Sequence, residues 1–265
     1  TTIMASLLPI YYADVAAGHL EKNIASAYWG YTTAIALLIA ALISPILGAT
    51  ADHLGKRKKF LATFLAMGVI GTASLMLVQR GDYIFASLFF ILANIGFAGS
   101  NVFYDALLPH IANDKEIDRV STAGFAIGYL GGGLLFALNI AWIVNWEIVG
   151  FADKGMAVRA AFGSVAIWWL IFSIPLLRNV NEPKKTGGDD KINVLTVGFK
   201  KIFATAKEIR KYKQVMIFLV GYWFYTDGVG TIIKMATIYG REMGIGSTHL
   251  MGAMLMVQFL GIPFT

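Results

Sequence analysis

The sequence contains no cysteine among its 265 residues. Disulfide bonds, thiol nucleophiles and metal sites built from thiolates are therefore excluded. Histidine is also scarce, because only four occur and they are scattered along the chain. No nucleophile stands at a useful spacing from a base, so an enzyme is a weak third alternative. We expect no catalytic residues, no metal site and no cofactor.

Charged residues are few. Only 14% of the residues are Asp, Glu, Lys or Arg and 57% are hydrophobic, whereas soluble domains have about 25% charged residues. The mean hydropathy is +0.65. This composition predicts an all-α membrane protein. The net charge of +6 does not indicate nucleic-acid binding, because the cations are concentrated in the loops on one side of a predicted membrane.

The cations gather in alternate loops between long apolar segments. One side of the predicted membrane holds 16 of the 22 Lys and Arg residues. By the positive-inside rule, that side is cytoplasmic and faces an anionic inner leaflet. The other six cations are Lys22, Arg80, Lys154, Arg159, Lys234 and Arg241. The outer loops are short, which suits a prokaryotic inner (plasma) membrane.

A short basic loop separates two apolar segments, 24–51 and 60–78, each long enough for a membrane helix. The loop and its flanks match the spacing G-x-x-x-D-x-x-G-[RK]-[RK] at Gly48, Asp52, Gly55, Lys56 and Arg57. A glycine in the helix allows a neighbouring helix to approach closely, and a glycine in the loop permits a tight turn. The alternative is a generic basic turn between membrane helices.

The fourth apolar segment, 83–108, is the most polar one. Asn94, Asn101 and Asp105 follow one another at steps of seven and four residues. At 100° per residue they lie within about 40° of one another on a helix, and Tyr104 adjoins them. We interpret this stripe as one wall of a polar pathway. Asn94 has an alternative role, because single asparagines often serve only to bind neighbouring membrane helices together.

The fifth segment is rich in glycine. Gly124, Gly128, Gly132 and Gly133 predict a flat helix face for close packing. A nucleotide-binding glycine loop is the rival interpretation, but that loop needs a preceding strand, which is not expected here.

The seventh segment carries Asp227 and, seven residues later, Lys234. A charge this deep in a membrane helix indicates a functional site, because its burial is costly without water or a partner. Lys234 has the alternative of extending to the outer interface. The neighbouring Gly228 and Gly230 predict local unwinding of the helix, as in the broken helices of transporters.

Three regions follow from these segments. Residues 1–177 form an N-terminal bundle of helices 1–6, with helix 1 truncated, and 178–213 form a cytoplasmic linker. Within this linker, 195–211 is expected to be an amphipathic basic helix on the inner leaflet. Residues 214–265 begin a C-terminal bundle with helix 7 and a truncated helix 8. Apolar runs reach both ends of the sequence, so we expect a fragment that is incomplete at both ends.

The loop spacing at 48–57 resembles the signature of the major facilitator superfamily of secondary transporters, with Thr50 where a bulkier apolar residue is usual. The fifth segment is similar to the superfamily pattern G-x-x-x-G-P-x-x-G-G, with Tyr129 where proline is usual. F-Y-D-A-L-L-P-H-I-A at 103–112, R-V-S at 119–121, G-Y-L-G-G-G at 128–133 and Y-T-D-G at 225–228 resemble the autophagy vacuole-effluxer-like group and its prokaryotic unknown-major-facilitator relatives. This resemblance covers nearly the whole chain.

The resemblance implies the major facilitator fold, with the first six-helix bundle and the start of the second. It also implies a secondary active transporter of a small polar solute, working by alternating access as a monomer. The fungal members export amino acids from the vacuole, so amino acids are candidate substrates. One of the carboxylates Asp105 and Asp227 would be available for proton coupling, so H+ is the candidate coupling ion. The motif at 48–57 would then form part of an inner gate. The alternative is a transporter-like membrane sensor or assembly factor that does not transport.

Overall fold

The computed structural model describes residues 2–54, 57–113, 115–181, 203–204 and 207–264. Every regular element in these ranges is helical, and no strand occurs among them. The prediction of an all-α membrane protein is therefore confirmed.

Six of the described helices are long and apolar enough to cross a membrane. They are α2 (Lys22–Leu54), α3 (Arg57–Ser74), α4 (Tyr83–Asp105), α5 (Ile117–Val144), α7 (Lys154–Asn179) and α9 (Lys213–Glu242). The shorter apolar helices are α1 (Thr2–Tyr11), which continues into the π-helical turn η1 (Tyr12–Ala16), and α10 (Ser247–Leu260). The remaining short elements are η2 (Leu75–Leu77), η3 (Leu108–His110), α6 (Trp146–Val149) and η4 (Ile262–Phe264).

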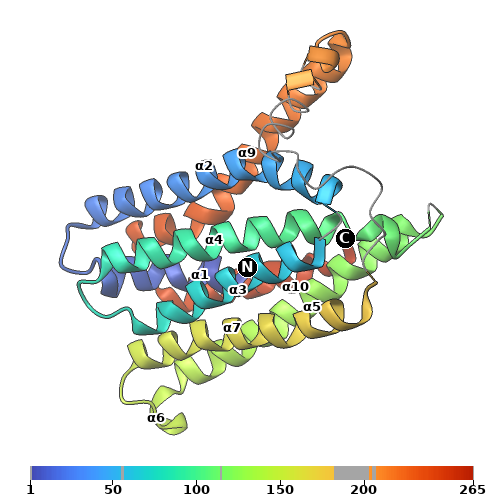
Figure 1. Cartoon of the computed structure of the whole chain (residues 1–265). Helices are drawn as coiled ribbons and strands as arrows, with labels where there is room; N and C mark the ends of the chain where they lie inside the picture. Colours follow the sequence, from blue (N-terminus) through green and yellow to red (C-terminus); the bar gives the residue numbers. More distant parts are fainter. Residues whose placement is uncertain (1, 55–56, 114, 182–202, 205–206, 265) are drawn as a thin grey trace.

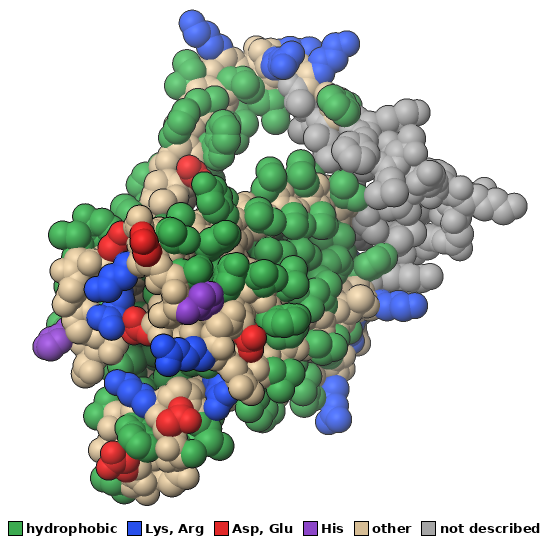
Figure 2. Space-filling model, turned by 90° about the vertical axis from the view of Figure 1, so that its left-hand side faces the viewer, with side chains coloured by type: hydrophobic (Ala, Val, Ile, Leu, Met, Phe, Trp, Pro, Cys, Tyr) green, Lys and Arg blue, Asp and Glu red, His purple; other side chains and the backbone are tan. Residues whose placement is uncertain are grey.

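The long helices run side by side, and the connections between them lie at two opposite ends (Figure 1). One end carries the turns at 17–21, 78–82, 145–153 and 243–246, and we call it the outer end because the cation pattern predicts it to be extracytoplasmic. Seen from this end, charged side chains of both signs gather on the surface, while hydrophobic side chains cover the adjoining flank (Figure 2). A lipid-facing surface requires such a hydrophobic flank.

Helix α1 lies at the centre of the packing and contacts α5, α7, α9 and α10. Seven of its ten residues are buried. A helix that is apolar all round is stable only when other elements surround it, which explains why α1 occupies this position. Around it, α4 packs between α2 and α3, and α3 also contacts α7.

Helices α3 and α4 approach each other unusually closely. A Cβ atom added to Gly96 would overlap the backbone of Gly68, and one added to Gly71 would overlap the backbone of Ala93. Small residues permit this approach, which increases dispersion contacts between membrane helices. The α3–α4 pair is therefore one of the most closely packed parts of the described fold.

Helix α9 is packed at only one of its ends. Thr237, Ile238 and Gly240 are buried, whereas none of its residues before Thr237, all within the described chain, is buried. In Figure 1 the orange first part of α9 leads away from the other helices. The contacts that hold α9 therefore lie near the outer end.

Candidate functional site: the junction of α9 and α10 with the first helices

Three contacts fasten α9 to the first two membrane segments. Arg241 forms an ion pair with Asp14 at 3.0 Å. The Thr237 hydroxyl donates to the carbonyl oxygen of Ala5 at 3.0 Å. The Trp29 indole N–H donates to the carbonyl oxygen of Lys234 at 3.3 Å. We call this set the outer clasp.

The outer clasp contains one ion pair and two hydrogen bonds, and each contributes modestly to stability. The side chains of Arg241 and Asp14 are 37% and 36% exposed, and such pairs contribute about 0.2–1 kcal/mol. A hydrogen bond contributes about 1 kcal/mol net. Each of these polar contacts is therefore weak by itself, and the burial of Ile238 in the core also holds this end of α9.

Helix α10 is held to α5 and α1 through a buried amide. The Gln258 side chain donates to the carbonyl oxygen of Tyr129 at 3.1 Å and accepts a hydrogen bond from the Thr2 hydroxyl. Gln258 is only 7% exposed. Buried amides need such partners, because an unpaired polar group in an apolar environment is costly.

The glycines of α5 allow α10 to approach. Cβ atoms on Gly132 and Gly133 would contact Gln258 and Phe259 of α10. The other two predicted packing glycines behave differently: Gly124 lies near the Tyr104 hydroxyl, and at Gly128 no described atom lies within 4 Å of the position that a Cβ atom would take. The close contact of α5 with α10 is thus confined to the later part of the glycine run.

The predicted polar stripe lies along one side of α4. Asn94 and Asn101 are partly buried, whereas Tyr104 and Asp105 are exposed. Viewed down the axis of α4, the stripe lies on the side opposite Gly96 and Phe103. Both of these residues face α3. The stripe therefore faces away from the α3–α4 contact.

Ser87 extends this stripe toward the outer end, seven residues before Asn94. Its hydroxyl lies 2.7 Å from the Thr32 hydroxyl of α2 and 3.1 Å from the Tyr12 hydroxyl of η1. These bonds show that the outer end of the stripe faces α2 and η1. The sequence reasoning missed Ser87, although its seven-residue step from Asn94 was a signal that could have identified it.

Lys234 and Asp227 lie on a continuous helix. The predicted unwinding near Gly228 and Gly230 is wrong, because α9 is helical from Lys213 to Glu242. In an apolar environment an intact helix keeps every backbone hydrogen bond internal, which outweighs the weak helix propensity of glycine.

The side chain of Lys234 folds back along α9. Its amine lies beside Gly230, 4.0 Å from the position that a Cβ atom would take there. Lys234 and Asp227, both within the described chain, interact electrostatically but form no ion pair within 4 Å. No hydrogen bond or ion pair among the described residues joins either side chain to the stripe of α4.

The predicted gating motif is described only in part. Gly48 lies in α2 close to Val102 of α4, and Arg57 begins α3. Asp52 belongs to α2, but its side chain lies outside the described structure, as do Gly55 and Lys56 entirely. Nearby, the Lys58 amine donates to the carbonyl oxygen of Val180 at 2.7 Å and so connects this region to the end of α7.

Two other predictions can be placed against the described residues. Most of the amphipathic helix expected at 195–211 lies outside them, while 203–204 and 207–209 are helical. Within the described ranges, no group of three His, Asp or Glu side chains could hold a metal ion.

Comparisons with known proteins agree with the fold. The family model described as vacuole effluxer Atg22-like matches residues 13–263. The uncharacterized MFS-type transporter YxiO of Bacillus subtilis is 36% identical over 99% of this chain and 61% of its own length. Autophagy-related protein 22 of Yarrowia lipolytica is 22% identical over 86% of this chain and 51% of its own length.

A further relative, autophagy-related protein 22 of Chaetomium globosum, is 25% identical over 84% of this chain and 44% of its own length. The chain thus spans between 44% and 61% of these curated relatives. No solved structure matches it at a significant level.

Proposed function

The chain belongs to the vacuole effluxer Atg22-like family within the major facilitator superfamily, and on that premise we propose that it forms part of a secondary active transporter. The transporter moves a small polar solute across the membrane by alternating access. The name of one relative, an MFS-type transporter, and the description of the family as vacuole-effluxer-like support this class of activity.

The one-sided packing of α9 is the observation that carries the proposal. Alternating access requires two groups of helices that touch at one end while they separate at the other. The outer clasp joins α9 to α1, η1 and α2, whereas the earlier part of α9 is not buried. The contacts of the outer clasp are weak enough to break and re-form during a transport cycle.

We propose that Asn94, Asn101, Tyr104 and Asp105 line the pathway on one side and that Asp227 and Lys234 line it on the other. Lys234 already leans toward Asp227, and no direct ion pair closes the space between them in the described structure. A solute with both a carboxylate and an ammonium group could fill that space. Amino acids are therefore the first substrates to test.

A carboxylate within the membrane also offers a place to carry a proton, because protonation removes the cost of keeping a charge there. We propose H+ as the coupling ion, with Asp227 as the first candidate carrier and Asp105 as the second. The motif at Gly48, Asp52, Gly55, Lys56 and Arg57 would form part of the inner gate, with the basic loops cytoplasmic in a plasma membrane.

Under the same proposal, the chain consists of a first bundle at 1–177, a linker at 178–213 and the start of a second bundle at 214–265. The protein acts as a monomer. The glycines Gly124, Gly128, Gly132 and Gly133 would form the face of the first bundle that slides against the second. The present contacts of Gly132 and Gly133 with α10 support this role.

Counterflow tests the proposal directly. The full-length protein is reconstituted into liposomes preloaded with one unlabelled amino acid at a time, and entry of the same labelled amino acid is measured. We expect transient accumulation for at least one amino acid and none in protein-free liposomes. If a broad panel of amino acids and other small polar solutes gives no counterflow, the sensor or assembly-factor alternative is favoured.

A further inference from the structure

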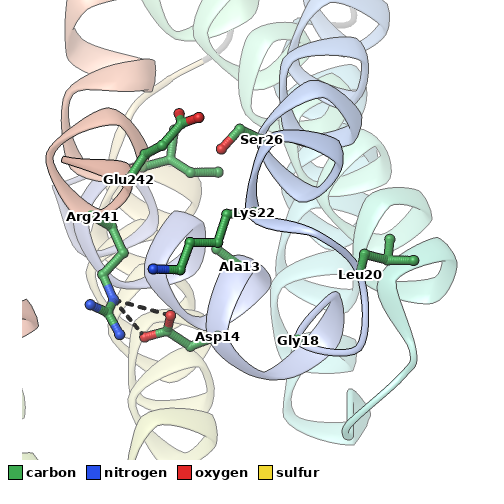
Figure 3. A pocket seen from close by; sticks show the side chains of 9 residues that line it. Ala13, Asp14, Gly18, Leu20, Lys22, Ser26, Arg241 and Glu242 are labelled. Carbon is green, nitrogen blue, oxygen red and sulfur yellow. Dashed lines mark hydrogen bonds and ion pairs between the residues drawn. The ribbon is translucent and has the colours of Figure 1, made fainter. Parts of the chain in front are cut away.

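A pocket of about 260 Å³ opens at the outer end between the turn after η1, the start of α2 and the end of α9 (Figure 3). It is separate from the proposed pathway residues of α4 and from Asp227. Its lining consists of Ala13, Asp14, Gly18, Leu20, Lys22, Ser26, Ile238, Arg241 and Glu242. The pocket thus lies across the same junction that the outer clasp holds together.

Four charged side chains line this small volume, two of each sign. Asp14 and Arg241 neutralise each other in the clasp ion pair. Lys22 and Glu242 line the same pocket, and neither has an ion-pair partner among the described residues. The pocket therefore offers one cation and one anion that are available to a ligand.

These available charges lie apart from each other. In Figure 3 the Glu242 carboxylate lies toward the top of the view with the Ser26 hydroxyl, whereas the Lys22 amine points toward the Arg241–Asp14 pair below. The Lys22 amine thus lies on the side of the Arg241–Asp14 ion pair, and the Glu242 carboxylate and the Ser26 hydroxyl lie at another part of the pocket. Leu20, Ile238 and Ala13 supply apolar parts of the lining.

We propose that this pocket binds a small zwitterion carrying one carboxylate and one ammonium group. Lys22 binds the carboxylate, and Glu242 binds the ammonium group with the Ser26 hydroxyl as an additional partner. Charge-assisted hydrogen bonds of this kind are stronger than neutral ones. The inference deepens the proposed function and rests on it for the view that the ligand is a transported solute at the outer entrance.

The arrangement also predicts what the pocket rejects. A solute with only one of the two charges leaves either Lys22 or Glu242 without a partner and gains only part of the binding free energy. Specificity is a difference between two affinities, so loss of one ionic contact is sufficient to discriminate. The pocket is open to water, and we expect weak, salt-sensitive binding, as for other exposed charges.

Ligand binding tests the inference on the full-length protein in nanodiscs. The probes are alanine, propionate and ethylamine, of which the last two each retain only one of the charges of alanine. Binding is measured by saturation-transfer NMR and by ligand-induced thermal stabilisation at low salt. We expect alanine to bind up to about fivefold more tightly than either analogue.

Variants locate the binding. Lys22→Gln and Glu242→Gln should each weaken alanine binding by up to about fivefold. Lys154→Gln and Glu147→Gln are the matched controls, because both residues are exposed at the outer end and neither lines the pocket. The controls should bind alanine like the unmodified protein. The comparison of the three probes on the unmodified protein needs no variant, so it decides even if a variant fails to fold.

Equal binding of all three probes, or no detectable binding of alanine, overturns the inference. It is also overturned if Lys22→Gln and Glu242→Gln bind alanine as the controls do. Failure of the proposed function is a different result: counterflow would be absent while alanine binding still depended on Lys22 and Glu242. Conversely, normal counterflow and normal alanine binding in both variants would overturn the inference about the pocket and leave the proposed function standing.

Discussion

Arg241 donates hydrogen bonds from its Nε atom to both carboxylate oxygens of Asp14, at 3.1 and 3.0 Å, across a separation of 227 residues. This relationship joins the first membrane segment to the end of the seventh. Because both side chains are more than a third exposed, the pair contributes at most about 1 kcal/mol. It is strong enough to bias a conformational equilibrium and too weak to lock it.

Breaking the Asp14–Arg241 pair should therefore open the outer end. In the full-length protein without other cysteines, we expect Asp14→Asn to raise the labelling rate of a cysteine introduced at Ser26 by up to about fivefold. The exchange variant Asp14→Arg with Arg241→Asp should restore slow labelling. Equal labelling in all three proteins would contradict a role for this pair in closing the outer end.

Asp227→Asn should separate coupling from translocation. The substitution keeps the size of the side chain and removes its charge, so insertion and thermal stability should change little. We expect uptake driven by a proton gradient to be lost, while counterflow without a gradient survives. Asp118→Asn, a change to an exposed carboxylate in the first turn of α5, is the control. Gradient-driven accumulation at the unmodified rate would instead make Asp105 the better candidate.

Gly96→Ala should destabilise the protein, because the added methyl group would overlap the backbone of Gly68. Overpacking of this kind costs about 1–3 kcal/mol, and a lower midpoint of thermal unfolding in detergent should reveal it. Gly128→Ala is the matched change in α5, where no described atom lies within 4 Å of the new methyl position. Equal effects of the two substitutions would argue against a tight α3–α4 contact.

Asp52→Asn should shift the balance between inward-open and outward-open states. An aspartate near the C-terminal end of α2 is unfavourable with respect to the helix dipole, so we expect it to have a cationic partner. Removing the charge of Asp52 would break this interaction and so alter the inner gate. The shift is measured by cysteine accessibility on both faces of the full-length protein. Unchanged accessibility on both faces would count against a gating role.

Local patterns predicted the helices well. The apolar runs at 24–51 and 60–78 correspond to α2 and α3 with extended or shifted ends. The expected fourth helix at 83–108 ends earlier, at Asp105. Apolar length is a strong signal because a membrane leaves few alternatives to a helix. Exact ends depend on turn geometry and neighbouring contacts, which a hydropathy pattern does not contain.

The junction was much less predictable. Helical spacing was enough to place Asn94 and Asn101 on one side of α4, because that relationship is local. The bonds from Trp29 to Lys234 and from Gln258 to Tyr129 join residues 205 and 129 positions apart. Such partners depend on how the helices are arranged in three dimensions. No single-sequence periodicity specifies them.

Because α9 is attached near one end, a small rotation there displaces its other end by a much larger distance. The helix has 30 residues, which corresponds to a length of about 45 Å. A rotation of about 10° around the outer clasp would therefore displace the far end of the helix by about 8 Å. Sub-ångström rearrangements at a few side chains near one membrane surface can thus be amplified into an aperture wide enough for a small solute at the opposite surface.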